Sequence, residues 1–275
     1  MKNRNLRWIA SALVTAGLAL AQSIFAGNVG KTYETGFPAI ARISTDLHDG
    51  LDSKFKRQLR PTPVLLENEV MPVLIPNLIS EGSNTIKAVF VSAGFVQLVN
   101  NLSHAKAIDH IDKGVFQKYV AALAQETGEK PLKTLPEADN PNNWSFDVLN
   151  EQVSNFNQMV GALVAIDMAH HYLGHYEKYA GQIGHADKQA VPITTIVKPD
   201  EWHAAVLYGA RNALECGLGV EGLKSFYECI EKMPTRPAWT AHFLGATTKV
   251  SKIKHDLEKL ESDFFMGKKF KGTGT

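Results

Sequence analysis

The feature that most constrains this chain is a long helix predicted from Asp147 to Tyr179, with histidines close to its C-terminal end. Its centre, Met159 to Met168, is apolar and is interrupted only by Asp167. His171 and His175 are four residues apart, so on one continuous helix their side chains point the same way and can bind one metal ion. The segment therefore predicts a helix that carries a candidate metal site.

Two neighbours of this pair have candidate roles of their own. Asp167 lies one turn before His171. In that position it can act as a further metal ligand, or it can orient His171 by accepting the N–H of the second ring nitrogen. His170 lies about 100° round the helix from His171 and needs another partner. Because the chain has ten histidines, an i,i+4 pair arises by chance about 0.4 times in this length. Paired histidines satisfied within a core are therefore the alternative to a metal site.

Residues 1–26 have the pattern of a secretory signal peptide. The apolar stretch from Trp8 to Ala21 is too short to favour a spanning helix, and it follows three basic residues, Lys2, Arg4 and Arg7. Cleavage is expected after Ala26. We therefore predict a protein exported to the periplasm or secreted, and an uncleaved N-terminal anchor is the alternative.

Removal of this signal leaves 249 of the 275 residues, which is enough for one domain with an ample core. The net charge changes from +1 to −2, because the signal holds three basic residues and no acidic ones. No basic stripe is present, which argues against a nucleic-acid partner. No second apolar run is long enough to cross a bilayer, so no transmembrane helix is expected after signal removal.

The first part of the mature chain predicts helix and then a small sheet. Residues 27–70 are expected to form a helical N-terminal extension, in which three large apolar residues fall at helical spacing, Ile40, Ile43 and Leu47. Val70 to Ile79 contains two prolines and fits an edge strand better than a helix. Lys87 to Val99 is rich in β-branched residues and predicts two strands, or a strand pair that pivots at Gly94.

The rest of the chain predicts helices separated by loops. Asn100 to Gln125 has a helical pattern, and proline-rich loops are expected over 128–143 and 181–199. Three helices should follow over 200–215, 220–233 and 247–264, before a flexible tail at 265–275. Apolar residues of the last helix recur at helical spacing at Val250, Ile253, Leu257 and Leu260.

Both cysteines, Cys216 and Cys229, lie in the mature part, where an exported protein can oxidise them. A turn at Gly217 to Gly219 is followed by about three helical turns before Cys229. That separation disfavours a disulfide between them.

Three segments, in this order, carry a family resemblance: Ala88 to Leu102, Val164 to His175, and Gly217 to Tyr227. Together they resemble the zinc metallopeptidases of the CAAX prenyl endopeptidase and HtpX type, whose motif is HELGH. The resemblance covers roughly residues 70–260. It implies a zincin-like metallopeptidase fold, α+β and mostly α, with a small sheet before the motif helix, in a single domain over 27–275.

The departures from the family pattern fall on its catalytic positions. Tyr172 stands where the family has the glutamate that polarises a zinc-bound water. A phenol titrates at about pH 10, so Tyr172 is a poor base at neutral pH. The family's third ligand is a glutamate on a later helix, and the register falls on Trp202, between Glu201 and His203. The resemblance thus implies Zn²⁺ held by His171, His175 and Glu201, or alternatively His203.

The implied chemistry is metal-assisted hydrolysis of a protein or peptide. Without the motif glutamate, we expect an exported metallopeptidase-like protein with impaired or no peptidase activity, which acts on binding partners through its surface. The alternative is an active zinc-dependent endopeptidase with a displaced general base, for which Asp167, Glu177 and Glu201 are candidates. A third hypothesis is a helical protein that uses His170, His171 and His175 for copper or iron.

Overall fold

A computed structural model describes residues 29–59, 62–81, 84–179, 191–270 and 272 of the chain. The predicted signal peptide at 1–26 lies outside these residues. The described part is mostly helical, with one three-stranded sheet, as predicted. None of its helices combines the length and the apolar character needed to cross a membrane.

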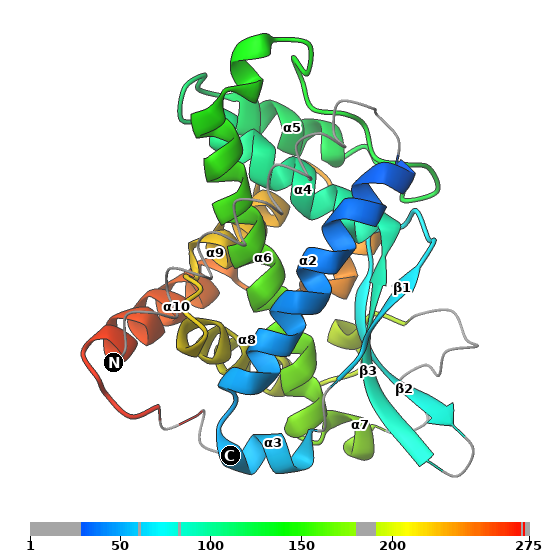
Figure 1. Ribbon diagram of the computed structural model, residues 1–275, viewed down its shortest axis with the longest axis vertical. Coiled ribbons are helices and arrows are strands. Elements are labelled where there is room, and N and C mark those ends of the chain that lie inside the picture. Colours follow the sequence, from blue (N-terminus) through cyan, green and yellow to red (C-terminus); the bar gives the residue numbers. More distant parts are fainter. Residues whose placement is uncertain (1–28, 60–61, 82–83, 180–190, 271, 273–275) are drawn as a thin grey trace.

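Helix α6 (Phe146–Tyr172) runs through the centre of the molecule (Figure 1). Ser145 caps its start by accepting the N–H of Val148. Every residue from Met159 to Tyr172 is buried, because other elements cover the helix on all sides. These are the sheet and four helices: α2 (Val29–Gly50), α4 (Ala93–Ile108), α8 (Pro199–Glu215) and α9 (Glu221–Lys232).

Glycines allow two of these helices to approach the backbone of α6 closely. A Cβ atom on Gly209 of α8 would lie 2.5 Å from the backbone nitrogen of Ile166. One on Gly222 of α9 would lie 2.6 Å from that of Met159. Both distances are far below van der Waals contact, so the packing of α8 and α9 on α6 depends on glycine at these positions.

The sheet lies along one side of α6 and has the order β1 (Val64–Glu67), β3 (Asn84–Ser92), β2 (Leu74–Glu81). β1 is parallel to β3, with Val64 opposite Val89, and β2 is antiparallel to it, with Pro76 opposite Val89. The predicted edge strand is thus confirmed as β2, where proline is tolerated.

The predicted strand pair at 87–99 is wrong in its second half. β3 ends at Ser92, whose hydroxyl oxygen accepts the N–H of Phe95 and so caps α4. Gly94 is not a pivot between strands: it lies in the first turn of α4, where a Cβ would collide with the carbonyl oxygen of Val70. The helical pattern predicted to Gln125 divides into α4 and α5 (Val115–Leu123).

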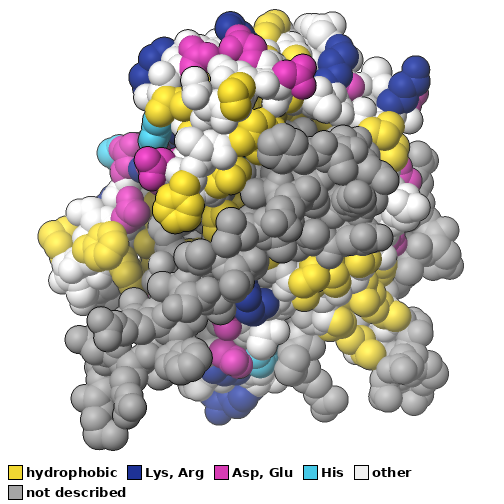
Figure 2. Space-filling view, turned by 45° about the horizontal axis from the view of Figure 1, so that its top comes forward, with side chains coloured by type: hydrophobic (Ala, Val, Ile, Leu, Met, Phe, Trp, Pro, Cys, Tyr) yellow, Lys and Arg dark blue, Asp and Glu magenta, His cyan; other side chains and the backbone are white. Residues whose placement is uncertain are grey.

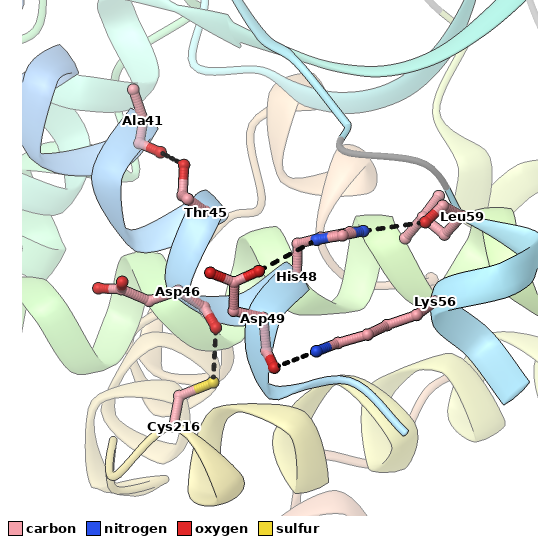
Figure 3. A network of polar contacts seen from close by, with 8 residues as sticks. All are labelled: Ala41, Thr45, Asp46, His48, Asp49, Lys56, Leu59 and Cys216. Atoms are coloured by element: carbon pink, nitrogen blue, oxygen red, sulfur yellow. Dashed lines mark hydrogen bonds and ion pairs between the residues drawn. The ribbon is translucent and has the colours of Figure 1, made fainter. Parts of the chain in front are cut away.

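The N-terminal extension is helical as predicted over α2 and α3 (Ser53–Gln58), although its end at Val64 enters the sheet as β1. Ile40, Ile43 and Leu47 are buried. The His48 Nε2–H donates to the Leu59 carbonyl at 3.0 Å, and the Cys216 thiol donates to the Asp46 carbonyl at 3.3 Å (Figure 3). The first bond joins α2 to the end of α3, and the second joins α2 to the end of α8.

The C-terminal helices match the predicted ones to within a few residues. α10 (Val250–Phe265) buries its predicted apolar face, and Phe270 in the tail packs edge-on against Tyr208 of α8 with ring centroids 4.9 Å apart. Both cysteines are free, as their separation indicated. Short turns of 3₁₀ helix complete the connections at Pro141–Trp144 (η1), Ile193–Thr195 (η2) and Ala238–His242 (η3).

Candidate functional site

The motif histidines do not share one helix, which corrects the prediction of a continuous helix to Tyr179. α6 ends at Tyr172, and His175 begins a separate short helix, α7 (His175–Lys178). Gly174 lies between them with φ of 77°, in the left-handed region that commonly ends helices. Lys87 of β3 holds the break by donating to the His171 carbonyl at 3.1 Å and pairing with Glu177 at 3.0 Å.

His171 joins α6 to the sheet. Its Nε2–H donates to the Ala88 carbonyl at 2.8 Å, and its ring stacks on Tyr176 with centroids 4.7 Å apart. Burial lowers the pKa of His171 to about 4, so the ring is neutral at pH 7. Its remaining nitrogen, Nδ1, is buried and has no hydrogen-bond partner.

His175 forms a hydrogen bond with His170. It is the partner of His170 that the sequence did not identify. Their Nδ1 atoms are 2.7 Å apart, so one of the two carries the shared proton. Burial lowers the pKa of both rings; the neighbouring histidines lower that of His170 further, whereas Glu201 acts against the effect of burial at His175. The Nε2 atom of His170 is buried without a partner.

Tyr172 lies in an aromatic cluster, not in an open site. It is only 5% exposed, and its ring is 4.4 Å from that of Phe55 and 6.3 Å from that of Tyr208, measured between centroids. Burial raises its pKa far above that of a free phenol. The residue at the position of the family's catalytic base is therefore a neutral core side chain.

The two candidates for the third ligand, Glu201 and His203, have partners outside the motif. Burial raises the pKa of Glu201, but hydrogen bonds from Lys178 and from the Tyr179 hydroxyl outweigh it and lower the value to about 2. His203 Nε2 lies 3.2 Å from a carboxylate oxygen of Asp256 on α10, without the alignment of a hydrogen bond. Burial lowers the pKa of His203.

The residues present do not fit the predicted zinc site. Among the described residues, no three His, Cys, Asp or Glu side chains are grouped so that they could hold a metal ion. The set of His171, His175 and Glu201, or His203 in its place, is therefore not assembled. Asp167 does not orient His171 either, because the imidazole N–H of His171 is bonded to the Ala88 carbonyl.

Asp167 and His170 instead line a small cavity of about 10 Å³ beside α6, with His242 of η3 opposite. Asp167 Oδ2, His170 Nε2 and His242 Nδ1 are all buried without a hydrogen-bond partner. Burial raises the pKa of Asp167 well above its usual range, and it lowers the pKa of His242 to about 4, so the His242 ring is neutral at pH 7. The cavity is about the size that admits one water molecule.

Trp202 borders the same cavity and is 4% exposed. The sequence register placed this residue where the family has its third metal ligand. Its indole packs edge-on against Tyr227, with ring centroids 6.1 Å apart. An apolar ring therefore lies beside the motif helix where the resemblance requires a carboxylate.

An open groove of about 1160 Å³ lies on the other side of α8. It runs between α8 and α10, and α7 and the chain after α10 close its ends; we call it the α8–α10 groove. Sequence reasoning did not predict this groove, because it depends on how these helices pack. Across the described part of the face in Figure 2, basic and acidic side chains are mixed, so the protein has no broad single-sign surface there.

Comparison of the chain with protein-family models, with curated proteins and with solved structures gives no match. The metallopeptidase resemblance thus remains a prediction from the sequence motifs.

Proposed function

We propose that this chain is an exported, zincin-like metallopeptidase relative without peptidase activity, which acts by binding a protein or peptide partner. The elements occur in the order that the resemblance implies: a small sheet, the motif helix α6, and then α8. A zinc peptidase needs a metal with an open coordination position and a group that activates water. The described residues at this site provide neither a set of metal ligands nor a group placed to activate water.

The observation that carries the proposal is the burial of Trp202 beside α6, with Glu201 and His203 turned to the groove. A carboxylate ligand is thereby replaced by an indole, which cannot bind zinc. The same conclusion follows at the catalytic position, because Tyr172 is enclosed by Phe55 and Tyr208.

Each candidate for a displaced base is either paired with a lysine or buried. Glu177 pairs with Lys87, and Glu201 with Lys178. Asp167 is buried, and that burial raises its pKa and disfavours the ionised form. A base must be ionised and close to the water that it activates.

The test is turnover of casein and of a mixed peptide library by the purified mature protein, with its metal content measured in parallel. We expect no cleavage with or without added Zn²⁺, and less than one bound metal ion per chain. Cleavage that a chelator abolishes and Zn²⁺ restores would overturn the proposal in favour of an active endopeptidase. A His171→Ala/His175→Ala double variant then shows whether that activity uses the motif.

A further inference from the structure

The α8–α10 groove has two helical walls with side chains of both charges. On α10, the residues that line it recur at i, i+4, i+7 and i+11, which is one face of the helix: Lys252, Asp256, Lys259 and Asp263. On α8 the lining runs from Asp200 to Arg211. The two walls are therefore approximately as long as each other.

Two of the four acidic groups in the groove have a cationic partner. Asp263 pairs with Lys268 at 2.7 Å, whereas Asp256 lies 3.2 Å from the ring of His203, whose pKa is lowered by burial. Glu201 pairs with Lys178. Arg211 is also occupied, because it pairs with Glu215 and lies over the ring of Phe264.

The basic groups that remain outnumber the acidic ones. Lys252, Lys259 and Lys269 line the groove, and none of them forms an ion pair with another described residue. Within the described ranges, Asp200 and Asp256 are the two lining carboxylates without a lysine or arginine partner. The groove therefore has a surplus of positive charge, although the mature chain is predicted to be slightly acidic.

The groove also offers an apolar surface. Leu173, Leu207 and Leu260 line it together with the rings of Tyr208 and Phe270, which contact each other. Tyr208 and Leu207 are only partly buried. An apolar side chain of a ligand can bury against this surface while charged groups beside it meet the lysines.

The dimensions favour a short peptide over a small molecule. The wall of α8 from Glu201 to Arg211 rises about 15 Å at 1.5 Å per residue, and an extended chain at about 3.3 Å per residue covers that length with roughly five residues. The groove volume of about 1160 Å³ also exceeds the range of roughly 300–1,000 Å³ that is usual for small-molecule sites.

We infer that the α8–α10 groove binds a short extended peptide segment that carries several acidic side chains around an apolar one. The inference rests on the proposed binding function and names the chemistry of its partner. The free cations are lysines, which attract carboxylates as point charges, and the one arginine is occupied. A surplus of one charge, three unpaired lysines against two unpaired carboxylates, is small for nucleic acid, which is recognised through extended basic surfaces.

The test is fluorescence anisotropy of the mature protein with three labelled five-residue peptides that share a central leucine. One has four acidic residues around it, one has four lysines, and one has four uncharged polar residues. We expect the acidic peptide to bind at least about tenfold more tightly than the other two at low salt, and the difference to shrink as salt screens it.

Two charge-reversal variants locate the site. Lys252→Glu/Lys259→Glu should weaken binding of the acidic peptide by about tenfold or more, because two attractions become repulsions. The control, Lys113→Glu/Lys130→Glu, changes the net charge equally at exposed lysines outside the groove lining and should change binding less than about twofold.

Equal weakening in both variants, or equal binding of all three peptides, would overturn the inference. Stronger competition by single-stranded DNA than by the acidic peptide would overturn it in favour of a general polyanion site. Mass spectrometry of the peptide after the measurement separates this inference from the proposed function. A bound but cleaved peptide refutes only the absence of peptidase activity, and an intact peptide that does not bind refutes only the groove ligand.

Discussion

The C-terminal end of α6 and the α8–α10 groove contain the same kinds of side chain in contrasting surroundings. At the end of α6, Asp167, His170 and His171 are buried, burial shifts the pKa of each towards the neutral form, and each has an atom without a partner. In the groove, Glu201 is partly exposed and pairs with Lys178, and the pKa of its carboxyl is lowered to about 2. Burial disfavours charge, and solvent with pairing preserves it. The residues that resemble a catalytic motif are therefore packed in the core, while charged and partly exposed side chains lie on the other side of α8.

The largest effect is expected from a substitution at the contact between α6 and α8, the helices that carry the two regions. Gly209→Ala should lower the free energy of unfolding by about 3 kcal/mol, because the new methyl group would press on the backbone of Ile166. Helix propensity alone predicts the opposite, a gain of about 1 kcal/mol. Chemical denaturation measures the sign, and an unchanged or higher stability would contradict the close packing.

The next effect tests the link between α6 and the sheet. His171→Ala removes the bond to the Ala88 carbonyl and a buried ring, so the free energy of unfolding should fall by about 2–3 kcal/mol. His255→Ala, on the exposed side of α10, is the matched control and should change it by less than about 0.5 kcal/mol. Similar values for the two variants would show that His171 has no structural role.

A smaller and pH-dependent effect is expected at Asp167. Because burial raises its pKa in the folded protein, its contribution to stability is greatest below the unfolded pKa and is lost as the pH rises towards the folded value. Asp167→Asn removes this loss, so it should raise stability by about 1–3 kcal/mol at pH 8 and less at pH 5. Thermal unfolding across this range measures it, and parallel curves for the two proteins would contradict the assignment.

The smallest effect is expected in the groove. The ion pair of Glu201 with Lys178 is at the surface, so Glu201→Gln should lower the free energy of unfolding by less than about 1 kcal/mol. A double-mutant cycle with Lys178→Gln measures the coupling directly. A coupling above about 2 kcal/mol would mean that Glu201 supports the fold and is not free to take part in binding.

The sequence predicted well where one helix presents a regular apolar face. Val250, Ile253, Leu257 and Leu260 gave the position and the buried side of α10, and α8 began and ended near its predicted limits. It predicted poorly where a single contact decides the structure. Ser92 starts α4 through a cap, and the break after Tyr172 depends on Gly174 and on Lys87 from a distant strand.

The candidate site was predicted in part for the same reason. The sequence identified His171, His175 and the register position of Trp202, but their partners come from other segments. The sequence also indicated that His170 needs a partner other than His171, but it did not connect His170 with Asp167, which lies one turn earlier on the same face. His242 approaches only through tertiary packing, and no spacing in the sequence connects it to α6.

The enclosure of Tyr172 by Phe55 and Tyr208 also bears on the evolution of this chain. A return to HELGH by Tyr172→Glu alone would put a carboxyl group among aromatic rings, where it would hold a proton and could not act as a base. Trp202 and the hydrogen bond of His171 would still stand in the way of a metal. Under the proposed function, peptidase chemistry at this site would need several coordinated changes, and no single substitution would supply it.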